Sequence, residues 1–183
     1  MMKKLKSIKT LVTLTAGLLA ILLPLGMILP TAMALPDQYE ETFYGALDDK
    51  FDRLVSIEEE KIVVIGGSSV AFGLDSAMME KYTGMPVINF GLYAALGTKL
   101  MLDLSLPEIG EGDIVVLAPE LDAQTLSLYF NSETTLQAMD GSFGMMKDIK
   151  AENLFCLLGG SWKLAAEKLS YMKNGTKPLS DGV

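Results

Sequence analysis

Histidine is absent from this chain of 183 residues. A serine hydroxyl needs a neighbouring base to become a good nucleophile, and histidine is the side chain that most often supplies one near neutral pH. Cysteine occurs once, at Cys156, which excludes an intramolecular disulfide. We expect Cys156 to be a small, buried apolar side chain. The acidic residues are scattered without a ligand pattern, so we predict neither a metal site nor a cofactor.

Charge is unevenly distributed along the chain. Four lysines precede the first acidic residue, Asp37, so residues 1–36 carry +4. Because the net charge of the whole chain is -8, the remainder carries -12. A body this acidic repels nucleic acid and anionic bilayer surfaces, and we expect neither as its partner.

A long uncharged segment follows the lysines, and Leu11 to Leu35 is almost wholly apolar. One interpretation is a cleaved signal peptide that ends at Ala34, after a small-residue site. The other is an uncleaved anchor, because a spanning helix needs about 20 apolar residues. We favour the anchor. Both interpretations keep the lysines inside and export the body, either held at the cell membrane by a single pass or secreted.

The whole chain divides into three parts. Residues 1–35 form the signal anchor or signal peptide, and residues 36–60 form a polar, helical connector in which apolar residues recur at helical spacing from Phe43 to Leu54. Residues 61–183 read as an α/β domain. We predict three strands in it, at Ile62–Ile65, Pro86–Phe90 and Ile114–Leu117.

Each interval between these strands has room for one crossover helix, which implies parallel strands in a β-α-β-α-β order. The fold class is therefore α/β, a three-layer, flavodoxin-like parallel sheet that is half of a doubly wound one. The first crossover helix begins near Asp75 or Ser76, buries Met78, Met79 and Tyr82, and ends at Gly84.

The second crossover helix covers about Ala94 to Leu104, with Leu96, Leu100, Met101 and Leu104 on one face. No strand signal follows Leu117. Helical fragments are expected instead at Thr125–Tyr129, Ser132–Met139, Phe143–Ile149 and Trp162–Met172. A third strand with nothing beyond it leaves a sheet edge open. Either another chain covers that edge, or this polypeptide is the front part of a longer one.

The turn after the first strand, Gly66-Gly67-Ser68-Ser69, is the stretch most suited to chemistry. A phosphate-binding loop would need a lysine near Gly73, and a dinucleotide fingerprint would need more glycines at fixed spacing; both are missing. A third interpretation is a nucleophilic serine at a helix N-terminus, where free backbone N–H groups can stabilise an oxyanion. Alternatively, Ser68 and Ser69 only satisfy the turn.

The segment Gly67 to Gly73 resembles the first block of the SGNH/GDSL hydrolase superfamily, with Ser68 in place of the usual Asp. The resemblance places Ser69 on the nucleophile. Val87 to Gly91 is similar to the second block, whose glycine contributes an oxyanion-hole N–H, a role that falls to Gly91 alongside the Ser69 amide. The Gly-Ser-Ser form resembles membrane-anchored, DltD-like envelope proteins. The family implies an exported esterase or O-acyltransferase that acts on acyl groups of envelope polysaccharide.

Two departures from this family stand in the sequence. After the third strand the chain has Leu117-Ala118-Pro119-Glu120 where the family has an Asn for the oxyanion hole. The C-terminal block that carries the histidine base is absent. Glu120 or Asp122 would be weak substitutes, because carboxylates are ionised at neutral pH.

As written, this chain is therefore expected to be nearly inert, as the N-terminal portion of an SGNH-like protein would be. The alternative is a non-catalytic surface binding or assembly protein that keeps the fold without the base. A flavodoxin-like nucleotide binder is a third possibility. The expected ligand is an acylated polysaccharide or another acyl ester.

Overall fold

The computed structural model describes residues 2–120 and 131–178. Its body is built on a small parallel sheet of three strands, β1 (Ile62–Gly66), β2 (Val87–Gly91) and β3 (Ile114–Ala118), in the spatial order β2-β1-β3. The predicted parallel β-α-β-α-β order is confirmed. Gly66 of β1 lies in register with Gly91 on one side and Ala118 on the other, so the three strands end at one level.

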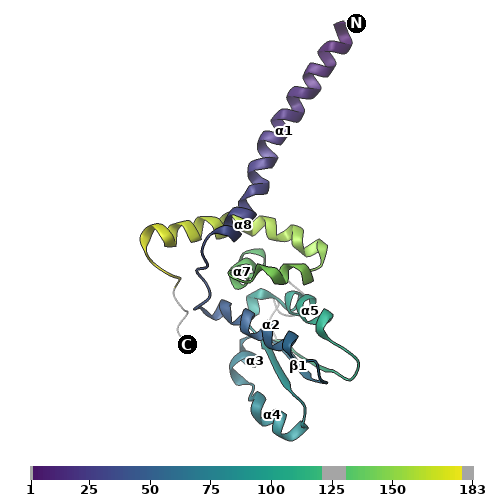
Figure 1. The fold of residues 1–183 in the computed structure, drawn as a ribbon, viewed down its shortest axis with the longest axis vertical. Helices are drawn as coiled ribbons and strands as arrows, with labels where there is room; N and C mark the ends of the chain where they lie inside the picture. The colour runs from purple at the N-terminus through teal and green to yellow at the C-terminus, as the bar shows by residue number, and fades with distance from the viewer. Residues whose placement is uncertain (1, 121–130, 179–183) are drawn as a thin grey trace.

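Helices surround this sheet and make up most of the described chain (Figure 1). The α-helices that follow the N-terminal helix are α2 (Ala46–Ser56), α3 (Ser68–Gly73), α4 (Ser76–Thr83), α5 (Thr98–Ser105), α7 (Ser132–Ala138) and α8 (Ala151–Asn174). Short 3-10 turns are η1 (Phe43–Gly45), η2 (Ala94–Leu96), η3 (Leu106–Glu108) and η4 (Phe143–Asp148).

The alternation of side chains along β1 divides the interior into two cores. Val63 and Ile65 point into the larger core, which α2, α5, α7 and α8 also line. Ile62 and Val64 point to the opposite face, where Val70 of α3 covers them. Strands β1 and β2 are therefore covered by helices on both faces, as continuous β-branched strands predict.

Helix α4 begins and ends where the sequence predicts. The Asp75 carboxylate accepts a hydrogen bond from the Met78 amide, and Gly84 ends the helix with φ of 72°. Of the three side chains predicted to be buried, Met79 packs partly buried against the smaller core, whereas Met78 is 56% exposed and Tyr82 is 80% exposed, so the prediction was wrong for these two. The unpredicted helix α3 packs against β1 and β2, so α4 shares this face of the sheet with it and covers less of the sheet than predicted.

The predicted helix from Ala94 to Leu104 is broken in two. Gly97 takes a φ of 81°, which ends η2 and starts α5. Left-handed φ values of this kind are readily adopted only by glycine. The buried face of this segment was predicted correctly, because Leu96, Leu100, Met101 and Leu104 are all buried.

Strand β3 is an open edge. Its side chains from Ile114 to Leu117 are between 36% and 54% exposed, and because they alternate in direction, both faces of the strand are uncovered. The open edge that the sequence predicts is confirmed. The predicted helix at Thr125–Tyr129 and the residue Asp122 lie outside the described residues.

The apolar N-terminal segment forms helix α1 (Met2–Ala34), which extends away from the body (Figure 1). Its last turns pack against the larger core through Ile28, Leu29 and the fully buried Ala32. Within the described part of the chain, no helix meets the length and apolarity that a membrane crossing requires. The spanning helix that the sequence favoured is therefore not found.

Helix α8 lies across the body at the base of α1 (Figure 1). Its Lys168 is fully buried and pairs with the buried carboxylate of Asp140. The Lys168 ammonium also donates to the Leu35 carbonyl, so α8 is tied to the start of the connector. Cys156 is exposed, which corrects the predicted burial. It lies off the helix face that Leu157 and its helical neighbours bury.

Candidate functional site

Ser68 and Ser69 are the first residues of α3, at the carboxyl end of the central strand β1. This edge of a parallel sheet is where α/β proteins usually bind their ligands. Val70 is buried against the sheet, whereas Ser69 is exposed. The sequence-predicted nucleophile is thus accessible at the open end of the sheet. The Ser69 hydroxyl has no hydrogen-bond partner among residues 2–120 and 131–178.

Glu120 connects the end of β3 to these serines. Its Oε1 atom accepts a hydrogen bond from Ser68 Oγ at 3.0 Å and another from the Ser69 amide at 2.9 Å. Gly67, the residue before α3, has no side chain to cap the helix, and a Cβ there would lie 2.6 Å from Glu120 Cδ. Glu120 therefore caps α3 from a neighbouring strand.

Asn89 joins β2 to the same short helix. Its side-chain amide donates to the Val70 and Ala71 carbonyls at 3.0 and 3.3 Å, and its Oδ1 accepts from the Gly91 amide at 3.1 Å. A Cβ on Gly91 would lie 2.5 Å from the Ala71 nitrogen. A glycine is thus required for α3 to lie this close to β2.

The structure brings the two predicted site residues to one end of the sheet, but both of their amides are already used. The Ser69 N–H is bonded to Glu120, and the Gly91 N–H is bonded to Asn89. An oxyanion hole needs N–H groups that point to the same open position. Either these amides change partners when a substrate binds, or they serve only to hold α3 in place.

Lys50 is a residue of this region that sequence reasoning missed. Its ammonium donates to the Asn89 carbonyl at 2.9 Å and to Asn89 Oδ1 at 3.3 Å. Burial lowers the pKa of Lys50, because removal from water disfavours the charged form. A signal was present in the sequence: Lys50 lies three residues after Leu47 and four before Leu54, on the apolar face of α2.

A row of aromatic rings leads away from the serines. Phe72 of α3 stacks on Phe43 with ring centroids 4.9 Å apart, and Phe43 contacts Tyr93 at 6.4 Å. Tyr93 then contacts Tyr44 at 5.6 Å in an edge-to-face arrangement. The row continues through Tyr39 to Tyr171, with both ring distances at 6.2 Å. We call these six rings the aromatic row.

The far part of the aromatic row lines a crevice of about 620 Å³. Polar groups converge on it: the Tyr39 hydroxyl donates to Glu167 at 2.8 Å, and the Gln137 amide donates to the same carboxylate at 2.9 Å. Burial, followed by the neighbouring Glu167, raises the pKa of Tyr39, so this phenol stays protonated. Aromatic walls with a few fixed polar groups are typical of small-molecule sites.

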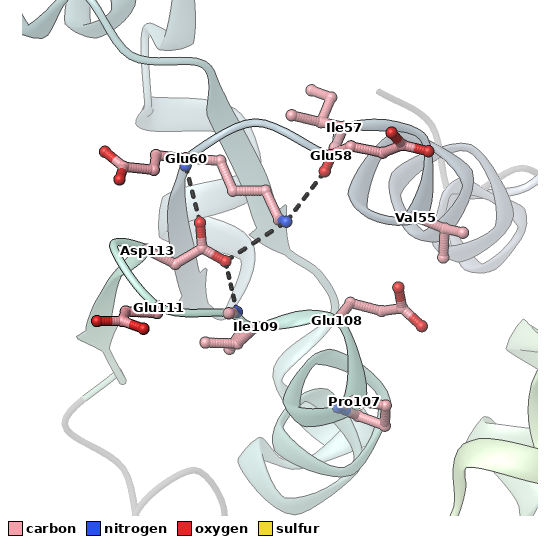
Figure 2. A pocket seen from close by; sticks show the side chains of 11 residues that line it. Val55, Ile57, Glu58, Glu60, Pro107, Glu108, Ile109, Glu111 and Asp113 are labelled. Carbon is pink, nitrogen blue, oxygen red and sulfur yellow. Dashed lines mark hydrogen bonds and ion pairs between the residues drawn. The ribbon is translucent and has the colours of Figure 1, made fainter.

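A second cleft, of about 360 Å³, lies at the opposite, amino end of β1 and β3 (Figure 2). Asp113 is its central residue and accepts from the Lys61 and Gly110 amides, both at 2.9 Å. Its carboxylate also lies 3.4 Å from the Lys61 ammonium. Burial opposes ionisation, but these two amides and the ammonium together lower the pKa of Asp113. Asp113 and Lys61 hold the amino ends of β1 and β3 together, and we assign them a structural role.

The described residues contain no group of three or more Cys, Asp or Glu side chains placed to bind a metal ion.

Comparisons of the chain with protein-family models, with curated proteins and with solved structures found no significant match. The resemblance to a family therefore depends on the sequence motifs alone.

Proposed function

We propose that this chain carries the nucleophile-bearing part of an exported, SGNH-like esterase or O-acyltransferase that acts on acyl groups of envelope polysaccharide, with Ser69 as the nucleophile. In this proposal the sheet belongs to a three-layer, flavodoxin-like fold. The observation that carries it is the position of Ser69. An exposed serine starts a helix at the carboxyl end of the central strand, beside the end of β2.

The reaction needs a base to take the Ser69 proton, and the chain has no histidine. Glu120 is the acidic group that contacts the two serines among the described residues. A carboxylate ionised at neutral pH is a weak base, so Glu120 alone gives slow chemistry. Because the uncovered edge of β3 leads directly to Glu120, an element that covers this edge would be placed to supply a stronger base.

The aromatic row supports a saccharide substrate. Sugar rings present C–H groups on their faces and hydroxyl groups at their rims, which suits aromatic faces flanked by carboxylate and amide groups. Phe72 lies three residues after Ser69 and is 58% exposed, and Tyr93 is 42% exposed. A chain of sugars along the row would bring its acyl groups toward Ser69.

The test is hydrolysis of a generic acyl ester and of an acetylated polysaccharide by the native protein. We expect the Ser69→Ala variant to lose activity and the Ser68→Ala variant to keep most of it, because Ser68 Oγ is bonded to Glu120. Full activity in Ser69→Ala would remove the nucleophile assignment. Circular dichroism spectra identical to the wild type serve as the control for folding of both variants.

A second function, saccharide binding without catalysis, is favoured by the two amides that are already hydrogen-bonded inside the protein. On this proposal the serines only cap α3, and the aromatic row does the binding. The two functions separate in one experiment. Polysaccharide binding by the Ser69→Ala variant, together with no ester hydrolysis by the wild type, supports the second function and rejects the first.

A further inference from the structure

Helix α8 exposes a row of large apolar side chains on one side. We define its outer face as Phe155, Leu158, Trp162, Leu169 and Met172, which are between 46% and 75% exposed. The opposite side of the helix is buried against the body through Leu157 and Leu164. Single exposed apolar residues are ordinary, but a contiguous face of this kind marks an interaction surface.

The outer face carries no charge. All five of its side chains are apolar. The two charged side chains of the helix centre that are not fully buried turn toward the body: Lys163 pairs with Glu133, and Glu167 accepts from the Tyr39 hydroxyl. This segregation makes α8 amphipathic, with an apolar face that no described element covers.

The outer face is continuous with the apolar surface of α1. Leu22, Gly26 and Ile28 of α1 and Leu158 and Trp162 of α8 line one apolar crevice of about 550 Å³. Beyond this crevice α1 leaves the body and has no neighbour in the described chain (Figure 1). The face of α8 therefore borders the side of the molecule from which α1 extends.

The exposed residues of α1 indicate which kind of partner covers this surface. At about 3.6 residues per turn, their positions cover more than half of the helix circumference. These residues are Leu11, Val12, Leu14, Leu18, Leu19, Leu22, Leu23 and Met27. A protein partner buries a stripe of a helix, whereas a lipid environment contacts it from many sides. A tryptophan at the edge of such a surface also matches the preference of this side chain for the lipid–water interface.

We propose that the outer face of α8 docks on the surface of a lipid bilayer, with Trp162 at the level of the headgroups. Docking occurs by insertion of apolar side chains and not by charge, because the face is uncharged and the body is acidic. The surface lies on a different helix from Ser69, and the proposal does not depend on acyl transfer. Docking would fix the orientation of the body, and with it the serine site, relative to the bilayer.

Trp162 is the only tryptophan in the chain, so its fluorescence reports on this face alone. The full chain is purified in mild detergent and reconstituted with phosphatidylcholine vesicles. We expect a shift of the emission maximum to shorter wavelength, weaker quenching by acrylamide, and strong quenching by lipids brominated near the headgroup. The double variant Leu158→Glu/Leu169→Glu should lose all three effects.

The matched control is Met78→Glu/Tyr82→Glu, which places two charges on equally exposed apolar positions of α4. This variant should keep the wild-type fluorescence. Two results would overturn the proposal. One is a vesicle-bound wild type whose Trp162 is as open to acrylamide as in the Leu158→Glu/Leu169→Glu variant. The other is protection that appears without lipid and rises with protein concentration, which would assign the face to a second copy of the chain.

Discussion

At the scale of single residues, close approach of backbone decides the geometry around the serines. Gly91 is buried under the start of α3, with the Ala71 nitrogen in the space that a side chain would need. Gly67 is likewise confined by Glu120. These two glycines let a helix, a strand end and a carboxylate meet at one point. The resemblance gives Gly91 an oxyanion role, but its missing side chain is as important for packing.

The substitution Gly91→Ala tests whether a side chain at this position is excluded by close packing. The added Cβ would lie 2.5 Å from the Ala71 nitrogen and 2.7 Å from Val70 Cγ1. We expect a loss of about 1–3 kcal/mol in the free energy of unfolding, the usual cost of overpacking. Urea denaturation in mild detergent, followed by circular dichroism, measures it. Gly73→Ala is the control, because nothing lies within 4 Å of its added Cβ; equal stabilities of the two variants would refute the close-packing argument.

At the scale of elements, the sequence predicts the sheet well and the helices around it less well. Runs of β-branched residues place β1, β2 and β3 to within one residue, and Asp75 and Gly84 place both ends of α4. Helix α3 could not be predicted, because it has only six residues and its cap comes from Glu120, 51 residues away. The wrong burial of Met78 and Tyr82 follows from that omission.

The candidate site could likewise be predicted only in part. The ends of adjacent parallel strands must meet, so the sequence is sufficient to bring Ser69 and Gly91 to one edge. It does not say which side chains satisfy their amides, since this depends on rotamers of Glu120 and Asn89. The aromatic row could not be predicted from the sequence either, because its rings come from segments far apart in the chain.

The pair Lys61–Asp113 at the amino ends of β1 and β3 gives a prediction at this scale. The pKa of Asp113 is lowered from its ordinary 3.8. Its ionisation therefore stabilises the fold above about pH 4, and this contribution is lost as the pH falls through the lower value of the folded state. We expect Asp113→Asn to lower the free energy of unfolding at neutral pH and to flatten its decline in acid.

Urea denaturation at stepped pH values measures both effects. The control is Asp52→Asn, which removes an exposed carboxylate from α2. It should leave the pH dependence as in the wild type. If Asp113→Asn showed the same acid decline as the wild type, the strand-end carboxylate would have no part in the pH dependence of stability.

At the scale of the whole molecule, a buried ion pair ties helix α8 to the segment that follows α1. Lys168 of α8 contacts Asp140 and the Leu35 carbonyl, and Asp140 also accepts from the Gln38 amide at 2.8 Å. Removal of one partner leaves an uncompensated buried charge, which costs about 3–5 kcal/mol. We expect this loss for both Asp140→Ala and Lys168→Met, measured by urea denaturation.

The double variant should lose much less than the sum of the two single variants, because no buried charge remains. The surface pair of Lys177 and Glu41 is the control, and Lys177→Met should leave stability unchanged. Additive losses in the double-mutant cycle would mean that Lys168 and Asp140 contribute to stability independently of each other.

We propose that Ser69, at the carboxyl end of the central strand, carries a reactive hydroxyl. The most direct test is to incubate the folded protein with a fluorophosphonate probe and to map the adduct by mass spectrometry. Because the chain has no histidine, we predict slow formation of a single adduct on the peptide that carries Ser69, retained in Ser68→Ala and lost in Ser69→Ala. A folded wild type that forms no adduct, or an adduct that survives in Ser69→Ala, would contradict the account.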